Sequence, residues 1–476
     1  MKDTTSRITS LALVGTMLAL TGCSTTGFAA ETPQTQSFSQ SQTPDAARLA
    51  LGTKATYQAP AEDIEYSEAP DEFEPVLLEH VARHGSRLLS SKKYDDLITQ
   101  LWEMAKSENG LTETGQRLGP VVAEITAVHE QVGYGNLSAL GQREHRDMAE
   151  RAYERMEDLF EEAEDDELPI NVATSGVDRA VDSAQNFVQG LTDQDDDLAE
   201  VIGEPVAKPD VLYFHDTDEA YNDFVDNDPL LAETLDKVEA DPEIQQVARR
   251  VVGRLFTEEF IAKLDSGAID LVDRGKGKKH LQSVVDAAMY LYELYVIAPG
   301  MADEHPIDFS QFLTNDDALV LSRVSEAEDF YEKGPSFVGS DVTYRMADVL
   351  LSDMLDAVTG VRTGETTQAA DFRFAHAEEI IPLAALLQLP GSTTAQPADS
   401  LFSYENNDWR GAQVAPMGSN IQWDVYANDD HEVLVRMLYN EREIPFGFDC
   451  EPIEEGSFFY ADTELRRCLG DLVKQD

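Results

Sequence analysis

The sequence predicts an α/β fold in which a mainly parallel sheet is flanked by helices on both faces, with a smaller α-helical domain inserted into it. Three segments carry the first part of this prediction, beginning at Val76, Leu168 and Asp371. Each runs from an apolar stretch through a polar turn into a helical pattern. Strands that alternate with helices in this way favour parallel pairing. Helical patterns dominate residues 205–334, which predicts the inserted domain.

The α/β domain is therefore expected to be discontinuous, over residues 67–204 and 335–476. The charged segment 141–161 has periodic apolar positions and predicts a helix between the first two strands. The helices after the second and third strands are expected at 177–191 and from about 377 to 387. Within the insert, helices are expected at 242–264, 284–295 and 315–331.

The N-terminal residues have the pattern of a bacterial secretion signal. A positively charged start precedes the apolar stretch 8–20, and Leu-Thr-Gly-Cys follows, ending at Cys23. This predicts a lipoprotein signal peptide over residues 1–22, with lipid attached to Cys23. A simple signal cleaved near Ala30 is the alternative.

Residues 23–66 are rich in Thr, Ser, Gln, Ala and Pro, which predicts a flexible tether. We therefore expect an exported protein of the cell envelope. Its contact with the membrane would be made by lipid on Cys23, since a stable anchor needs more than one acyl chain and lipoproteins carry three.

The charge balance limits the partners of this protein. The formal net charge is -55, from 91 acidic and 36 basic residues. A surface of this sign repels DNA and RNA, so no nucleic-acid partner is expected. If the substrate is an anion, a local group of cations must overcome the overall field.

Two of the three cysteines, Cys450 and Cys468, lie close together near the C-terminus. In an exported chain a disulfide between them is the economical interpretation, and two free thiols are the alternative. No cysteine–histidine spacing matches a zinc site.

The residues after the first apolar stretch, Arg83-His84-Gly85-Ser86-Arg87, place an imidazole between two guanidiniums. Arginines hold a phosphoryl group through forked, charge-assisted hydrogen bonds, and a histidine can attack phosphorus and carry it covalently. Open α/β sheets bind ligands at the carboxyl ends of their strands. The motif predicts a phosphoryl-transfer site at this strand end, and a surface loop with a chance histidine is the alternative.

The other two strand ends supply groups of the same kind. Arg179 lies near the start of the second helix, and His376 and Glu378 lie at the start of the third. Helix N-termini favour anions, and guanidiniums supply the charge that a metal supplies elsewhere, so neither metal nor cofactor is expected. Glu378 is placed to protonate the leaving alkoxide and then to activate water. A polar helix cap and a solvated arginine are the alternatives.

The motif at residues 83–87 resembles the signature of the histidine phosphatase superfamily, in the branch of histidine acid phosphatases and phytases. His376-Ala377-Glu378 resembles the His-Ala-Glu tripeptide of the multiple inositol polyphosphate phosphatases. The resemblance runs from about residue 70 to the C-terminus. It includes further segments at 137–141, 178–184, 212–216 with Tyr221, 374–387, and 415–417 with Asn420.

The resemblance implies roles for the site residues. His84 would be the nucleophile and Glu378 the proton donor. The scissile phosphate would be bound by Arg83, Arg87, Arg179 and His376. The substrates implied are phytate and lower inositol phosphates, with 2,3-bisphosphoglycerate as a further one.

A substrate with six phosphates needs cations beyond those on the scissile group. The insert contains Lys276, Lys278 and Lys279, and Lys333 lies at its end. These lysines are predicted to contact distal phosphates, and solvated loops are the alternative.

Two other functions compete with an inositol polyphosphate phosphatase that forms a phosphohistidine. One is an acid phosphatase of the same fold that acts on small sugar phosphates or 2,3-bisphosphoglycerate. The other is a non-enzymatic lipoprotein that binds phosphorylated ligands, which the presence of both His84 and Glu378 disfavours.

Overall fold

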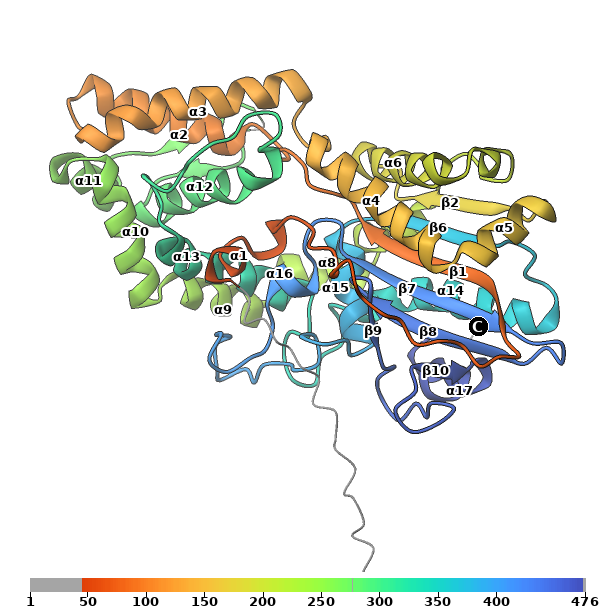
Figure 1. Cartoon of the computed structure of the whole chain (residues 1–476). Helices are drawn as coiled ribbons and strands as arrows, with labels where there is room; N and C mark the ends of the chain where they lie inside the picture. The colour runs from red at the N-terminus through yellow and green to blue at the C-terminus, as the bar shows by residue number, and fades with distance from the viewer. Residues whose placement is uncertain (1–44, 276, 474–476) are drawn as a thin grey trace, which may run out of the picture. The chain divides into compact units, whose positions relative to one another are not determined.

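Strands from both halves of the chain form one mixed sheet in the computed structural model, which describes residues 45–275 and 277–473 (Figure 1). The strands are β1 (Glu74–Arg83), β2 (Ile170–Thr174), β3 (Val206–Ala207), β6 (Ala370–Ala375), β7 (Asn420–Ala427), β8 (Val433–Tyr439), β9 (Arg442–Ile444) and β10 (Phe459–Ala461). Their order is β10-β8-β7-β1-β6-β2-β3, with β9 paired to β8.

The predicted α/β fold is confirmed. The three predicted strands are β1, β2 and β6, and they are neighbours that run parallel, with β3 added beyond β2. The other half of the sheet is antiparallel, because β7 pairs with β1, and β8, β9 and β10 follow by antiparallel pairing. These C-terminal strands were not predicted from the sequence.

Helices cover both faces of the sheet, with α4, α5 and α6 above it and α14 and α17 below it in Figure 1. Alternate residues of β1 point to opposite faces. Leu78 and Ala82 pack with α4–α6, whereas Leu77 and Val81 join the core on the other face. The covering helices are α4 (Ala139–Arg155), α5 (Glu157–Asp165), α6 (Asp178–Gln194), α14 (Asp348–Thr363), α15 (Ala377–Leu386) and α17 (Asp462–Leu469).

A second group of helices lies beside the sheet and includes most of residues 205–334. Its members are α2 (Lys93–Ser107), α3 (Glu113–Val132), α8 (Glu219–Asn227), α9 (Pro229–Glu239), α10 (Pro242–Leu255), α11 (Glu258–Asp265), α12 (Val284–Ile297) and α13 (Asn315–Glu332). α2 packs on α12, and α3 packs on α10, although both precede residue 205. The described residues form one compact unit, so the boundaries at 205 and 334 stay a prediction.

Two predicted helices are interrupted. The helix expected over 141–161 divides at Met156 into α4 and α5. The helix expected over 242–264 divides at Phe256, which adopts an extended conformation, pairs with Leu111 and is buried. Burial of one large side chain against a neighbouring segment outweighs continuation of the helix at this point.

The expectation that a flexible tether extends to residue 66 is wrong for the described part of it. The short helix α1 (Ala46–Leu49) packs on α13, and the 3-10 turn η1 (Gly52–Lys54) packs on α16 (Gly411–Val414). Ala50 and Ala55 are fully buried. The apolar run Ala46-Ala47-Arg48-Leu49-Ala50-Leu51 explains this contact, since it supplies surface that burial stabilises.

The remaining predictions about the ends of the chain have different outcomes. The predicted disulfide between Cys450 and Cys468 is present. The predicted signal peptide, Cys23 and the tether before residue 45 lie outside the described residues, as does Lys276. Over the ranges that are described, no helix is both long and apolar enough to cross a bilayer.

Candidate active site

The ends of β1 and β6 place two histidines side by side. The strands are in register, with Arg83 opposite Ala375. His84 and His376 therefore follow the two strands at the same level. The His84 N–H donates to the Ala375 carbonyl oxygen at 2.9 Å, and the two imidazole rings lie 5.5 Å apart between centroids.

The end of β2 brings in the third group of side chains, since β2 pairs with the other edge of β6. The Ser175 hydroxyl forms a hydrogen bond of 2.9 Å with Nε2 of His376. Arg179 lies in the first turn of α6, which begins at Asp178. Burial and, next, the charge of the Arg179 guanidinium lower the pKa of His376 to about 3.

His84 has the properties of a nucleophile. Its side chain is 2 % exposed. Its Nδ1 lies 2.9 Å from the Gly85 carbonyl oxygen, which can only accept, so Nδ1 carries the ring proton and Nε2 keeps its lone pair. Burial lowers the pKa of His84 well below its usual range, and Arg83 and Arg87 lower it further. The imidazole is therefore neutral at physiological pH and ready to attack an electrophile through Nε2.

Two of the guanidiniums around His84, those of Arg83 and Arg87, are each anchored through one nitrogen to main-chain oxygens. Nη1 of Arg83 donates to the Thr53 and Ala415 carbonyl oxygens at 2.6 and 2.5 Å, and Nη1 of Arg87 donates to the Leu88 carbonyl oxygen at 2.9 Å. Burial lowers the pKa of Arg83 to about 10, against the charges of Glu378 and Asp329. Burial, and then the charges of Arg179 and Arg83, lower the pKa of Arg87 to about 10, so both guanidiniums stay charged. Within the described protein the buried Nε atoms of Arg83, Arg87 and Arg179 have no acceptor. Such donors are costly to leave unpaired, and an anion would satisfy them.

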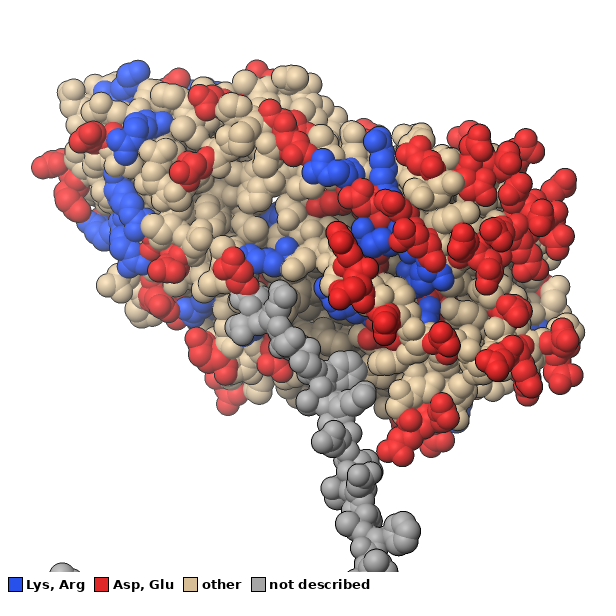
Figure 2. Space-filling view, in the orientation of Figure 1, with Lys and Arg blue, Asp and Glu red and all other residues tan. Residues whose placement is uncertain are grey.

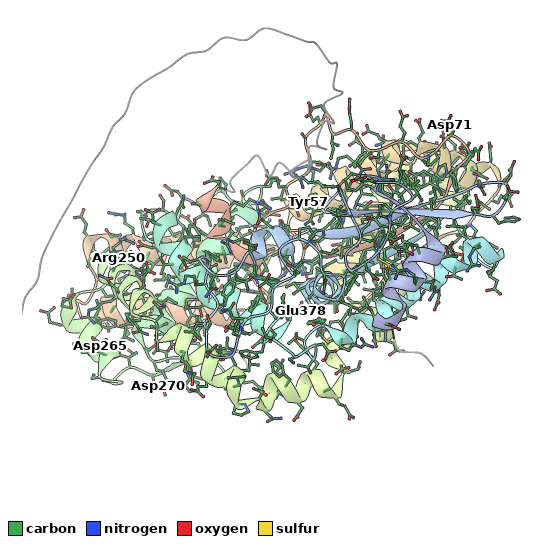
Figure 3. The ribbon with its side chains drawn as sticks, turned by 90° about the horizontal axis from the view of Figure 1, so that it is seen from below. Tyr57, Asp71, Arg250, Asp265, Asp270 and Glu378 are labelled. Atoms are coloured by element: carbon green, nitrogen blue, oxygen red, sulfur yellow. A yellow bond between two sulfur atoms is a disulfide. The ribbon has the colours of Figure 1, made fainter. Side chains whose placement is uncertain are left out.

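Glu378 lies at the start of α15 with 32 % of its side chain exposed. Figure 3 shows it between the sheet and the second group of helices. Burial alone would raise the pKa of Glu378, but Lys333, and after it His376, His215 and Arg83, hold it below its usual range. The carboxylate is therefore ionised in this state, although it can reach solvent.

The loop after β1 is held by a buried carboxylate. Glu144 of α4 accepts hydrogen bonds from the Ser86 N–H at 2.6 Å, from the Ser86 hydroxyl at 2.8 Å and from the Tyr57 N–H at 2.9 Å. A Cβ on Gly85 would lie 2.5 Å from the Gly141 carbonyl oxygen. Glycine is required here because the loop and the start of α4 approach this closely.

Sequence reasoning missed a pair of groups that fix the start of α15. Glu379 accepts a hydrogen bond from the His376 N–H at 2.8 Å, which forms a capping box. It also pairs with Nδ1 of His215 at 2.9 Å. Burial raises the pKa of Glu379 to about 7, against the effect of His215. An acidic residue three positions after His376 was the available signal.

Sequence reasoning also missed Thr53 and Lys54, which come from the segment expected to be a tether. Thr53 supplies a carbonyl oxygen to Arg83. Burial lowers the pKa of Lys54, against the charges of Glu293 and Asp329, and Arg87 lowers it further. No sequence signal pointed to either residue.

The predicted distal lysines lie in two different settings. Lys278 and Lys279 are exposed in the loop between β4 (Leu271–Val272) and β5 (His280–Leu281), and their N–H groups donate to Asp273 at 2.9 and 2.8 Å. The loop backbone is thereby fixed while the side chains face solvent. Lys333 contacts protein carboxylates instead, with its Nζ 2.7 Å from Asp329 Oδ1 and 3.6 Å from Glu378 Oε1.

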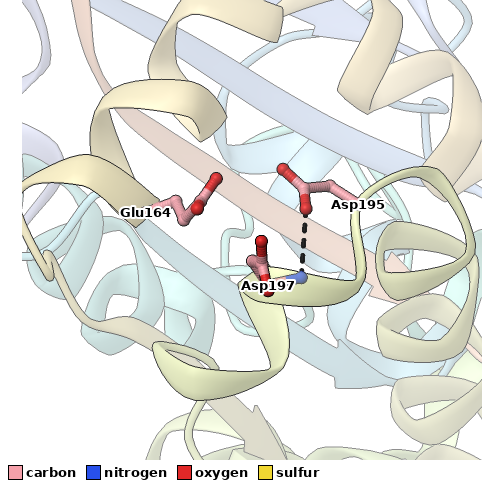
Figure 4. Close-up of side chains that lie close together, drawn as sticks. All are labelled: Glu164, Asp195 and Asp197. Atoms are coloured by element: carbon pink, nitrogen blue, oxygen red, sulfur yellow. Dashed lines mark hydrogen bonds between the residues drawn. The ribbon is translucent and has the colours of Figure 1, made fainter.

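One group of acidic side chains elsewhere in the described ranges could in principle hold a metal ion. Oxygens of Glu164, Asp195 and Asp197 lie within 4.8 Å of one another (Figure 4). Asp195 accepts from the Asp197 N–H at 3.0 Å and so caps the 3-10 turn η2 (Asp196–Glu200). The group lies at the opposite end of α6 from Arg179 and takes no part in the candidate site.

The negative charge of the surface and the positive charge of the site lie in different parts of the protein. Figure 2 shows acidic side chains gathered over the α/β side of the molecule. One helix on this side, α5, has the strongly acidic sequence Glu-Asp-Leu-Phe-Glu-Glu-Ala-Glu-Asp. Of the site arginines, Arg83 is buried and Arg87 and Arg179 are half-buried. Because charges are screened over about 8 Å at physiological salt, the arginines dominate the field that a bound phosphate would meet.

A neutral imidazole enclosed by guanidiniums, with a carboxylate near it, defines an enzyme that transfers phosphoryl groups through histidine. Comparison with known proteins agrees. Residues 77–440 match the histidine phosphatase superfamily (branch 2). The structure is similar to that of Bifidobacterium longum multiple inositol polyphosphate phosphatase in complex with inositol hexasulfate, with 35 % identity, a TM-score of 0.84, and coverage of 89 % of this chain and 98 % of that one.

The complex of the same Bifidobacterium enzyme with phosphate gives 34 % identity, a TM-score of 0.85 and the same coverage. The phytase from D. castellii shares the fold, with 14 % identity, a TM-score of 0.61, and coverage of 90 % of this chain and 85 % of that one. The chain therefore belongs to branch 2 of the histidine phosphatase superfamily and, within it, to the multiple inositol polyphosphate phosphatases. It is a phosphoric monoester hydrolase.

Proposed function

We propose that this enzyme hydrolyses phytate and lower inositol polyphosphates through a phosphohistidine formed on His84. The observation that carries the proposal is the neutral His84 ring, with Nδ1 held by a carbonyl oxygen and arginine donors unpaired around it. Support for the substrate comes from the similar Bifidobacterium longum enzyme, whose complex contains inositol hexasulfate.

The first half-reaction forms a bond from His84 Nε2 to phosphorus and breaks the ester bond between phosphorus and the inositol oxygen. The arginines and His376 hold the phosphoryl oxygens as their charge develops. Glu378 donates a proton to the departing oxygen. Glu378 is ionised without substrate, and the negative charge of an arriving phosphate raises its pKa, so substrate binding brings in the proton that is later transferred.

The second half-reaction reverses these roles. The ionised Glu378 accepts a proton from water, the water oxygen bonds to phosphorus, and the bond between phosphorus and Nε2 breaks to release inorganic phosphate. His84 returns to its neutral form with the proton still on Nδ1.

Phosphate release from phytate, with the products resolved by isomer, tests the proposal. Parallel assays with glucose 1-phosphate and 2,3-bisphosphoglycerate test the two smaller substrate classes. Hydrolysis of these two without hydrolysis of phytate would contradict the proposal. The His84→Ala variant is expected to lose at least about a thousandfold in kcat and still to bind inositol hexasulfate. Turnover equal to that of the parent would exclude His84 as the nucleophile.

The Glu378→Gln variant tests the role of the proton donor independently of the role of the nucleophile. Loss of the acid should reduce kcat/KM strongly for an inositol phosphate, whose alkoxide leaves poorly, and only weakly for para-nitrophenyl phosphate. Because kcat/KM reports phosphorylation, the later hydrolysis step does not disturb the comparison. An equal loss on both substrates would assign the proton to another group.

We further propose that Lys276, Lys278 and Lys279 contact phosphates distant from the scissile one. Neutralising all three is expected to raise KM for phytate more than KM for glucose 1-phosphate. A matched variant in which three lysines of other helices are neutralised, Lys106 of α2, Lys237 of α9 and Lys263 of α11, controls for overall charge. Equal changes in KM on both substrates would reject this role.

Export and lipid anchoring are part of the same proposal. They are supported by the signal-like residues 1–22, by Cys23 and by the disulfide, which forms in oxidising compartments. Expressed in a bacterium that processes lipoproteins, the Cys23→Ser variant is expected to lose labelling by radioactive palmitate and to leave the membrane fraction. Membrane retention of that variant would contradict the anchor.

A further inference from the structure

A chain of polar contacts joins the nucleophile's side of the site to Glu378. Nη1 of Arg83 donates to the Thr53 carbonyl oxygen at 2.6 Å, and the Thr53 hydroxyl donates to Asp329 Oδ2 at 2.8 Å. The other oxygen of Asp329 accepts from Lys333 Nζ at 2.7 Å, and the same Nζ lies 3.6 Å from Glu378 Oε1. Three of these five residues have no role in the proposed chemical steps.

Lys333 is shared between two carboxylates and is not free to follow a substrate. Its side chain is 17 % exposed, and that of Asp329 is 13 % exposed. Burial would lower the pKa of Lys333, but Asp329 and then Glu378 raise it well above its usual range, so the ammonium keeps its charge. Asp329 lies near the end of α13 and is fixed in turn by the hydrogen bond from the Thr53 hydroxyl. Lys333 is therefore a cation of fixed position beside Glu378.

We propose that Lys333, held in place by Asp329, is a positioning residue for Glu378 and sets the pH range in which Glu378 carries its proton. The inference rests on the proposed role of Glu378 as proton donor. It differs from the prediction that Lys333 binds a distal phosphate of the substrate.

The chemistry explains why such a cation is useful. Glu378 must hold a proton while the ester bond breaks and must be without one while water attacks. Burial and the phosphate charge favour the protonated form, and a fixed ammonium nearby opposes them. Because Asp329, and not the substrate, holds Lys333, the inference is that the ammonium keeps its place through a turnover, so that the carboxyl group can lose its proton again.

Other groups also face Glu378, and Lys333 has the largest effect among the charges that lower its pKa. These groups are Arg83 at the end of β1, Arg87 in the loop after it, Arg179 of α6, Tyr213 and His215 around the turn η3 (Phe214–Asp216), Tyr221 of α8, Glu332 at the end of α13, and His376 and Glu379 at the start of α15.

The test is the pH profile of kcat/KM for phytate, measured with the full-length enzyme. Activity is expected to fall on the alkaline side as Glu378 loses its proton. Lys333→Met should move this alkaline limb upward by about 1–3 pH units, the usual effect of one opposite charge at this distance. Lys333→Arg, which keeps the charge, should restore the parent profile. Asp329→Asn should move the limb downward, because it removes a negative charge near Glu378.

Two controls keep the result specific. With para-nitrophenyl phosphate the shifts should be much smaller, because its leaving group needs little protonation. The double variant Lys333→Met with Asp329→Asn leaves no unpaired buried carboxylate at position 329. It should therefore fold where the single variant fails, and should still show a smaller upward shift. Thermal unfolding reports folding separately.

The outcomes distinguish this inference from the proposed function. A raised KM for phytate in Lys333→Met, with the alkaline limb unchanged, would overturn the inference and assign Lys333 to substrate binding. An alkaline limb that survives in Glu378→Gln would refute the role of Glu378 itself. If the parent does not hydrolyse phytate, the substrate proposal fails, and the same profiles are measured on the phosphomonoester that it does hydrolyse.

Discussion

Removal of the N-terminal segment provides the sharpest test of how the site is built. A chain that begins at Glu62 keeps every predicted catalytic residue, and the sequence suggests that it should be a complete soluble enzyme. The structure predicts the opposite, because residues 45–61 contain Thr53 and Tyr57, which contact the site through Arg83 and Glu144.

The expected loss of folding stability follows from three hydrogen bonds to charged groups. These are Arg83 to the Thr53 carbonyl oxygen, the Thr53 hydroxyl to Asp329, and the Tyr57 N–H to Glu144. At about 1.5–3 kcal/mol each, their loss costs about 5–9 kcal/mol. A folded domain of this kind has only about 5–15 kcal/mol of stability in total. Exposure of the apolar surface that Ala50 and Ala55 now cover adds to the loss.

The assay compares chains that begin at residues 45 and 62 with the parent. Thermal unfolding and phosphate release from phytate are measured for each. The chain from residue 45 should match the parent in both measurements. The chain from residue 62 should be unfolded, or should unfold at a much lower temperature with little activity. A stable and active chain from residue 62 would refute the reasoning.

Three further predictions follow from other parts of the structure. Burial alone would raise the pKa of Asp424, but Arg155 and Arg436 hold it below its usual range. Its contribution to stability is therefore present above pH about 4 and is lost as the pH falls further. In chemical denaturation, Asp424→Asn should cost about 3–5 kcal/mol at pH 7 and less at pH 3. An equal loss at both pH values would contradict this. Cys450→Ser opens a loop with a sequence separation of 18 and should lower stability by about 3 kcal/mol, as reduction of the parent should. Lys54→Met removes a cation that lies near Arg87 and Arg83 and should raise KM for phytate and for glucose 1-phosphate about fivefold, equivalent to ~1 kcal/mol; an unchanged KM on both substrates would contradict this.

The parallel half of the fold and the groups at its strand ends could be predicted because both follow from local patterns. An apolar run followed by a helical period defines a strand and its crossover, and parallel strands end at one edge of a sheet. The same logic brings His84, Arg179 and His376 near one another from the sequence alone. β7 and β8 were missed although Val433–Tyr439 is a nearly continuous apolar run, because no helix pattern accompanies it.

Other features could not be predicted from the sequence. Thr53 contacts Arg83 through its carbonyl oxygen, which every residue type has, so nothing in its side chain identified the contact. The contacts of Lys333 depend on α13 ending beside α15, which is a property of packing. The division of a helix at Phe256 depends on its pairing with Leu111 in a distant segment.

The anchoring of Arg83 has a consequence for how this enzyme tolerates mutation. Both acceptors that orient its guanidinium are main-chain oxygens, of Thr53 and Ala415. A substitution at either position changes the side chain and leaves the acceptor in place, provided that the backbone path is kept. Homologous enzymes can therefore differ at these two positions without moving the charge that we propose binds phosphate, and pairwise covariation with Arg83 would not reveal either contact.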